Sequence, residues 1–170
     1  MNLSPGLRKF TLTVHVTSSP GLLGAIAAFL ILAIAALTGR NDRLVVGAYL
    51  AMDLIARTVI LPLMFGSLLS GLVLGLGTAW GLVRHYWVLI KLIVTSFAAA
   101  VLLIKMLLVA EAARMAAAPV PDGDALRQMG QQLLFHSAAG LTVLLLPMVL
   151  STYKPRGLTR HGLRRQGGQV

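Results

Sequence analysis

The chain has 170 residues, of which 57% are hydrophobic and 12% are charged, and it contains no cysteine. Ordinary globular proteins carry roughly 25% charged residues, so a lipid bilayer is a simpler surrounding for this composition than water. The absence of thiols excludes disulfides, Cys-ligated zinc and iron–sulfur clusters. The net charge of +10 does not indicate a nucleic acid partner, because no platform of aromatic and basic residues accompanies it.

Four apolar blocks, taken in chain order, predict an all-α domain that crosses a bilayer four times. Each block exceeds the roughly 20 residues that span about 30 Å of hydrocarbon. The connections are short and rich in polar residues, glycine or proline, which favours an antiparallel four-helix bundle. The predicted transmembrane domain covers residues 1–153, with helices at about 9–37, 44–76, 85–112 and 126–153, and a basic tail covers residues 154–170.

The distribution of Lys and Arg outside the blocks predicts the orientation. The side with both termini has eight of these residues, five of them in the tail, and the opposite side has four. Loops with more Lys and Arg stay in the cytoplasm, so both termini are expected there. The basic tail is also expected to attract anionic lipids. The eight are Arg8, Lys9, Arg84, Lys154, Arg156, Arg160, Arg164 and Arg165, and the four are Arg40, Arg43, Arg114 and Arg127.

Ionisable side chains inside the blocks are the main candidates for a site. Each charge costs at least about 2.5–3.5 kcal/mol to place at the centre of a span, so such residues usually face the bundle interior or a watery cavity. A rise of about 1.5 Å per residue sorts them into two levels. Asp53, Arg57, Lys105 and His136 are expected to form an outer-leaflet cluster, and His15 and Lys91, with His85 at the rim, an inner one. A structural role for each residue, as a paired charge or a helix-to-helix hydrogen bond, remains the alternative.

Asp53 and Arg57 are four residues apart, so they lie on one face of a helix and can form an ion pair. The same face continues into a run of small residues, which lets a helix approach a neighbour closely. That neighbour is either within the chain or in a second copy, which makes a homo-oligomer one expectation. The continuation comprises Met64, Ser67, Gly71 and Gly75, and kinks are expected at Pro20, Pro62 and Pro147.

Two segments resemble a known family. Lys9-Phe10, His15-Val16, Gly21 and Gly24 resemble the opening of the copper-resistance D-type (CopD-like) membrane domain and of related bacterial membrane proteins without an assigned function. Residues 81–92 resemble the third segment of that family, in which an aromatic residue precedes a leucine-lysine-leucine. The resemblance implies a bacterial inner-membrane protein and carries over His15, Tyr86 and Lys91. The chain departs from the pattern at Leu23, where an aromatic residue commonly precedes the glycine.

Three functions remain open from the sequence. The first is a membrane-embedded binding or permeation module for a metal ion such as copper, with His15 and His136 as candidate ligands, since imidazole suits copper. The second is a b-type haem electron carrier, which needs two facing histidines from among His15, His85 and His136. The third is an accessory or assembly protein with structural buried charges. An enzyme is not favoured, and no catalytic residue is assigned, because no hydrolase or metalloprotease motif is present.

Overall fold

The computed structural model describes residues 3–77 and 85–153, and within these ranges every element is a helix. Four continuous helical stretches are each long and apolar enough to cross a membrane. This is the number of spans that the sequence predicts. The elements are α1 (Pro5–Thr38), α2 (Asp42–Ile55), the π-helical turn η1 (Ala56–Ile60), α3 (Leu61–Gly77), α4 (Tyr86–Ala116) and α5 (Gly123–Tyr153), with α2, η1 and α3 forming one stretch.

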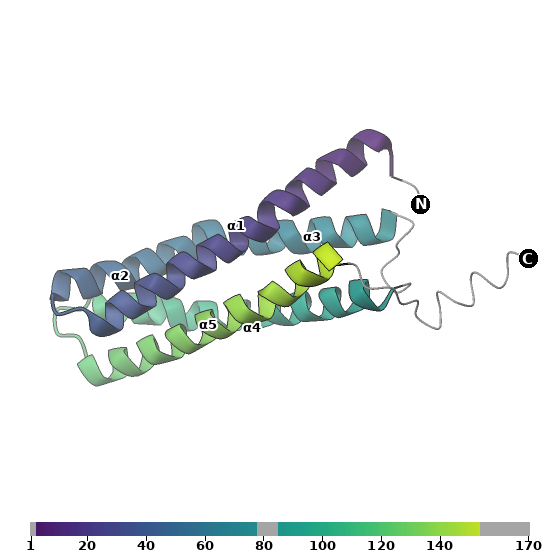
Figure 1. Ribbon diagram of the computed structural model, residues 1–170. Helices are drawn as coiled ribbons and strands as arrows, with labels where there is room; N and C mark the ends of the chain where they lie inside the picture. The colour runs from purple at the N-terminus through teal and green to yellow at the C-terminus, as the bar shows by residue number, and fades with distance from the viewer. Residues whose placement is uncertain (1–2, 78–84, 154–170) are drawn as a thin grey trace, which may run out of the picture.

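The stretches run antiparallel along one long axis (Figure 1). Helix α1 packs against α2, α3 and α5, while α4 packs against α5, α2 and α3. Within the described residues α1 and α4 therefore occupy opposite corners of the bundle, as do α2–α3 and α5. The start of α1, the end of α3, the start of α4 and the end of α5 lie at one end, which we call the open end. The α1–α2 and α4–α5 connections lie at the other end, which we call the loop end.

Capping residues set the helix starts, and they extend three of the helices beyond the predicted blocks. Ser4 accepts a hydrogen bond from the Leu7 amide at 3.4 Å, and Pro5 follows at the first helical position. At α2 the Asn41 side chain accepts from the Arg43 amide at 2.9 Å. Near the start of α5 the Asp122 carboxylate accepts from the Ala125 amide at 3.0 Å. These polar caps precede the apolar blocks, so hydrophobicity alone places the starts too late.

Pro62 lies two residues beyond the π-helical turn η1. A proline has no amide hydrogen and its ring collides with the carbonyl four residues earlier, here that of Thr58. In η1 the Leu61 amide instead reaches back five residues to the Ala56 carbonyl. The extra residue in this turn widens the helix where the proline ring must fit, and such single π-turns recur at functional sites. Pro20 and Pro147 lie inside α1 and α5, which both continue through them.

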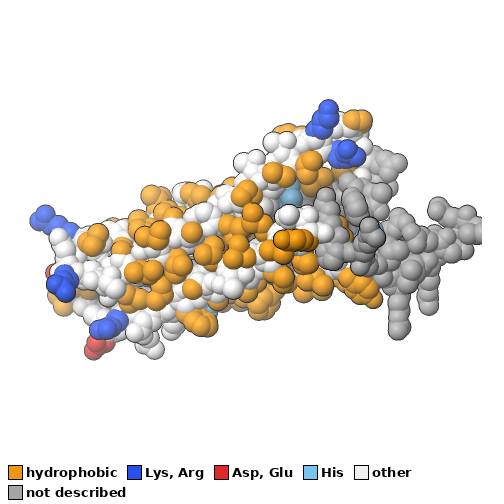
Figure 2. Space-filling view, in the orientation of Figure 1, with side chains coloured by type: hydrophobic (Ala, Val, Ile, Leu, Met, Phe, Trp, Pro, Cys, Tyr) orange, Lys and Arg blue, Asp and Glu red, His pale blue; other side chains and the backbone are white. Residues whose placement is uncertain are grey.

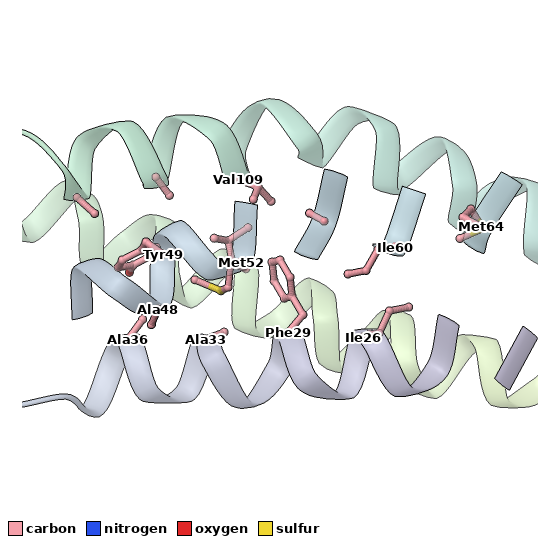
Figure 3. Packing of buried hydrophobic residues seen from close by; sticks show 14 of the residues in the cluster. Ile26, Phe29, Ala33, Ala36, Ala48, Tyr49, Met52, Ile60, Met64 and Val109 are labelled. Carbon is pink, nitrogen blue, oxygen red and sulfur yellow. The ribbon is translucent and has the colours of Figure 1, made fainter. Parts of the chain in front are cut away.

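The core is packed most tightly toward the loop end, where small residues let the helices approach. Met52 and Tyr49 are the largest fully buried side chains, and Figure 3 shows them just above the labelled Ala33, Ala36 and Ala48. The Tyr49 hydroxyl donates to the Leu126 carbonyl of α5 at 3.0 Å. It reaches across the bundle beside Gly130, where a Cβ atom would lie 2.4 Å from the hydroxyl oxygen. The buried alanines at this end are Ala33, Ala36, Ala48, Ala112, Ala113 and Ala116.

The surface matches a membrane environment. Figure 2 shows hydrophobic side chains along the body of the bundle and Lys and Arg side chains gathered near its two ends. Large apolar side chains such as Ile104, Leu107 and Phe97 are about two-thirds exposed or more, which suits contact with lipid rather than water. The predicted basic tail and the turn before α4, including Arg84, lie outside the described residues.

Candidate polar centre

His15 of α1 points into α3, where its ring is held by two polar groups. Its Nδ1 lies 3.0 Å from the Ser67 carbonyl oxygen and 3.1 Å from the Ser70 hydroxyl. The ring packs over Gly71, where a Cβ atom would lie 3.2 Å from its Cε1. A carbonyl oxygen only accepts, so Nδ1 carries the proton and Nε2 of the neutral ring presents a lone pair. Gly71 thus leaves room for the histidine, and Ser67 fixes its tautomer.

Lys91 of α4 occupies the other side of this ring. Its Nζ lies 3.4 Å from His15 Nε2 and donates to the Ser151 hydroxyl of α5 at 2.6 Å. Ser151 in turn donates to the Pro147 carbonyl one turn earlier at 2.7 Å. Two side chains from two other helices therefore contact the Lys91 ammonium group. We call His15, Ser19, Ser67, Ser70, Lys91 and Ser151 the polar centre.

Ser19 and Ser67 complete the polar centre between α1 and α3. Their hydroxyls lie 2.8 Å apart. Next to them Ser18 is buried against Gly66, where a Cβ atom would lie 2.9 Å from the Ser18 hydroxyl. Small residues on both helices therefore allow close approach, and their hydroxyls bond across the contact as in other transmembrane helix pairs.

The polar centre lies toward the open end, near the expected level of the lipid headgroups. Helix α4 has 31 residues and so measures about 46 Å, which leaves about 8 Å beyond each face of a 30 Å hydrocarbon layer when it is centred. Lys91 is five residues from its start, a rise of about 8 Å. Ser151 is two residues from the end of α5. Lys91 is therefore expected at the boundary between hydrocarbon and headgroups, with His15 slightly deeper.

No Asp or Glu side chain pairs with this lysine in the part of the chain that the structure describes. The chain has five Asp and Glu residues, and all of them lie toward the loop end. In the described residues both ion pairs lie there too, and neither includes Lys91. Coulomb attraction weakens with distance, and Asp53 and Glu111 lie about 20–30 Å from Lys91 along the bundle axis. The half of the molecule that contains Lys91 is thus positively charged. The five are Asp42, Asp53, Glu111, Asp122 and Asp124.

The structure brings together His15 and Lys91 of the expected inner cluster, but the outer cluster does not form within the described residues. Asp53 and Arg57 pair at 2.8 Å, with side chains 25% and 55% exposed on the outside of the bundle. The His136 ring bonds to the Gln132 carbonyl of its own helix at 2.6 Å, and α5 lies diagonally across the bundle from α2. Lys105 is at a similar height to Asp53 yet forms no ion pair with it.

The expected continuous stripe from Asp53 to Gly75 is broken by η1. Each helical residue turns by about 100°, and the extra residue of a π-turn rotates α3 relative to α2 by about that angle. Asp53 and Arg57 consequently face outward, whereas Met64, Ser67 and Gly75 are buried. The small-residue run packs against α1 of the same chain, through Gly71 and His15. Packing against α1 of the same chain therefore accounts for the burial of these small residues.

The polar centre does not fit a metal ion or a haem iron. Both nitrogens of His15 are engaged, and Nε2 faces an ammonium group 3.4 Å away, whose charge would repel a bound cation. In residues 3–77 and 85–153, no three or more His, Asp or Glu side chains are grouped in a way that could hold a metal. His136, the other candidate ligand, is directed to its own backbone. His85 lies beside Trp87, with ring centroids 6.5 Å apart.

Comparisons with protein-family models, with curated proteins and with solved structures find no match to this chain. The resemblance to CopD-like domains therefore stays a prediction from the quoted residues. Sequence reasoning missed Ser19, Ser70 and Ser151 as members of the polar centre. Two signals were available: Ser70 is one turn after Ser67, and Ser151 is one turn after Pro147. Serines inside a helix commonly bond to their own backbone, so their presence alone does not indicate a polar site.

Proposed function

We propose that this protein is a multi-pass protein of the bacterial inner membrane, with both termini in the cytoplasm, whose polar centre binds a small anionic ligand. The observation that carries this proposal is the Lys91 ammonium, held by His15 and Ser151 in a half of the chain without carboxylates. A network that only joins helices needs hydroxyls and amides, not a charge. An ionisable residue inside a span is a functional-site candidate by default, and here the ammonium is directed to His15 and Ser151 rather than left free in the headgroups.

The sign of the ligand follows from the same contacts. Lys91 is a donor and His15 Nε2 is directed to it, so the centre offers positive charge and N–H and O–H donors. Permeation of a metal cation would require passage beside Lys91 with no carboxylate to offset the repulsion. An anion instead gains charge-assisted hydrogen bonds, which are about twice as strong as neutral ones. The protein is therefore still a membrane-embedded binding module, but its ligand is an anion rather than a metal ion.

An accessory or assembly role is the second candidate, and the Asp53–Arg57 pair favours it. This pair lies on the outward side of the bundle with Arg57 55% exposed. Charges on the lipid side of a span are rare, so contact with another membrane protein would explain their position. The two roles are compatible, because the pair lies on the outside of the bundle and the polar centre lies between helices nearer the open end.

Single-cysteine labelling tests the orientation. The chain has no cysteine, so Val120→Cys in the α4–α5 connection, where Val120 is 89% exposed, and Gly168→Cys in the tail give unique labels. In intact cells a membrane-impermeant maleimide is expected to label the first variant and to leave the second unlabelled until the membrane is opened. The reverse pattern would overturn the cytoplasmic placement of the termini. Equal labelling of the two variants in intact cells would place both cysteines on one side of the membrane, which contradicts a single span, α5, between them.

Native mass spectrometry tests the binding role. Protein purified from bacterial membranes in a mild non-ionic detergent is expected to carry a small-molecule adduct, and Lys91→Met is expected to lower its occupancy at least about tenfold. Hydrogen bonds to a charged group contribute about 1.5–3 kcal/mol, and 1.4 kcal/mol corresponds to tenfold.

Lys105→Met is the matched control, because Lys105 lies on the same helix about 21 Å along its axis from Lys91. It should leave the adduct unchanged. Absence of any adduct that depends on Lys91, in protein that remains folded and monodisperse, would refute the binding role.

A further inference from the structure

We infer that the ligand of the polar centre is a phosphate monoanion of the phosphodiester type, as carried by anionic phospholipid headgroups, and that Lys91 and Ser151 are its principal donors. This inference rests on the proposed binding function and specifies its ligand class. Neither the resemblance to CopD-like domains nor any comparison assigns such a ligand. Four observations support it: the level of the site, its charge, its donors and its access.

The level of the site matches that of lipid phosphates. With α4 centred in the bilayer, Lys91 lies at the hydrocarbon boundary and Ser151 about 5 Å beyond it. Lysine side chains extend further toward the headgroups along their apolar stems. A lipid phosphate at this level needs no movement into the hydrocarbon to reach either residue. A soluble anion would meet the same donors from the aqueous side.

The charge of this half favours an anion that stays ionised. Arg8 and Lys9 in the first turn of α1 are exposed and lie at the same end of the bundle as Lys91. The sequence adds Arg84 and five basic residues of the tail, and no Asp or Glu occurs beyond residues 42–124. Basic sites between transmembrane helices on the cytoplasmic side are one way in which proteins bind anionic headgroups. A phosphodiester keeps its charge at any physiological pH.

The donors of the site suit single hydrogen bonds to separate phosphate oxygens. Lys91 is a compact charge with three donor hydrogens, two of which are directed at His15 and Ser151. The third hydrogen is left for a ligand, and the ammonium group has no ion-pair partner among the described residues. The Ser151 hydroxyl donates to the Pro147 carbonyl and can rotate toward a phosphate oxygen without moving the helix. Lysine binds phosphate as a point charge, so this donor set does not require a bidentate arginine.

Access from the lipid side follows from the packing of α4. Within α4, Ala99 is the first buried residue, and residues 86–98 are all partly or fully exposed. The corresponding parts of α1 and α5 contribute buried residues, among them Ser18 and Pro147. A headgroup that reaches Lys91 along α4 therefore displaces no core side chain. Lys91 itself is half-buried, so it contacts both the bundle and its surroundings.

The test uses the full-length protein, stripped of lipid in a neutral detergent, with three probes. These are phosphatidylglycerol, diacylglycerol of the same chain length, and inorganic phosphate. Native mass spectrometry and thermal-shift titration measure binding to the wild type, Lys91→Met, Ser151→Ala and Lys105→Met. Phosphatidylglycerol is expected to bind the wild type and Lys105→Met alike, Lys91→Met at least about tenfold more weakly, and Ser151→Ala about threefold to tenfold more weakly. Diacylglycerol is expected not to bind at the site.

The competition experiment identifies the source of the phosphate, and the variants test whether a phosphate binds at all. Competition by millimolar inorganic phosphate would identify a free phosphate as a second occupant, and absence of competition would restrict the site to lipid. Equal binding of phosphatidylglycerol to the wild type and to both Lys91→Met and Ser151→Ala would overturn the inference. So would diacylglycerol binding as tightly as phosphatidylglycerol. Ser151→Ala retains Lys91, so it decides the question if Lys91→Met does not fold.

Failure of this inference is distinguishable from failure of the proposed function. An adduct that depends on Lys91 but contains no phosphorus by tandem mass spectrometry would leave the binding function standing and refute the phosphate. Absence of every Lys91-dependent adduct would refute both. Phosphatidylglycerol recovered with the wild type, and lost on Lys91→Met, would support both.

Discussion

Gly130→Ala is expected to destabilise the bundle by about 1–3 kcal/mol, the usual effect of overpacking a core. The added Cβ would lie 2.4 Å from the Tyr49 hydroxyl and 2.9 Å from Leu37 Cδ2. Tyr49 is 2% exposed and bonded to the Leu126 carbonyl, so it has little room to withdraw. Reversible unfolding in mixed micelles with increasing dodecyl sulfate measures the change.

The second arm of this experiment removes the hydroxyl. Tyr49→Phe alone is expected to cost about 1 kcal/mol, because it deletes one hydrogen bond. In the Gly130→Ala background the same change also relieves the collision, so the double variant should be clearly more stable than the sum of the two singles predicts.

Gly140→Ala is the control, since no atom lies within 4 Å of the added Cβ. It should be neutral or slightly stabilising, as alanine is the better helix former. Strict additivity of Gly130→Ala and Tyr49→Phe would contradict the crossing of Tyr49 beside Gly130.

The spans could be predicted because they depend on composition alone. Each apolar block is longer than a bilayer crossing, and the short connections leave one simple order of helices. The pairing of His15 with Lys91 was also accessible, because depth along a helix follows from residue number. The helix starts were less accessible, since Ser4, Asn41 and Asp122 act through caps that lie outside the apolar pattern.

What the sequence did not reveal is rotation about the helix axis. Depth places Asp53 level with Lys105 and His136, but only packing decides whether they face one another. The π-turn before Pro62 changes the facing of α3 relative to α2, and no periodicity of 3.6 residues includes that extra residue. Gly71 and Gly130 illustrate the same point, because each is explained by one side chain from a distant part of the chain, His15 and Tyr49.

The same rotation leads to the second large expected effect, at the Asp53–Arg57 pair. Asp53→Asn alone leaves Arg57 without its carboxylate on the outside of a span, and Arg57→Gln alone leaves Asp53 without its cation. A single charge in the middle of a span costs about 2.5–3.5 kcal/mol on insertion scales. Because this pair is partly exposed and the headgroups solvate part of the charge that is left, each single variant is expected to lose about 2 kcal/mol, slightly less than that range.

The double variant Asp53→Asn with Arg57→Gln is expected to be close to wild type in unfolding, because it removes both charges together. The Glu111–Arg114 pair provides the matched control. Its side chains are 39% and 72% exposed near the end of α4, in reach of water, so its single and double variants should show no measurable coupling. Additive losses at Asp53 and Arg57 would mean that the two charges are solvated separately and do not depend on each other.

Combining the double variant with the adduct measurement separates the two candidate roles. If Asp53 and Arg57 only neutralise each other within the bilayer, the double variant keeps its Lys91-dependent adduct and its stability, and a purely structural account of the pair suffices. If they form a contact with another membrane protein, the double variant remains folded and keeps the adduct but loses association with that partner. The polar centre lies between helices near the open end and the pair lies outside the bundle, so a loss of the adduct in the folded double variant would contradict their independence.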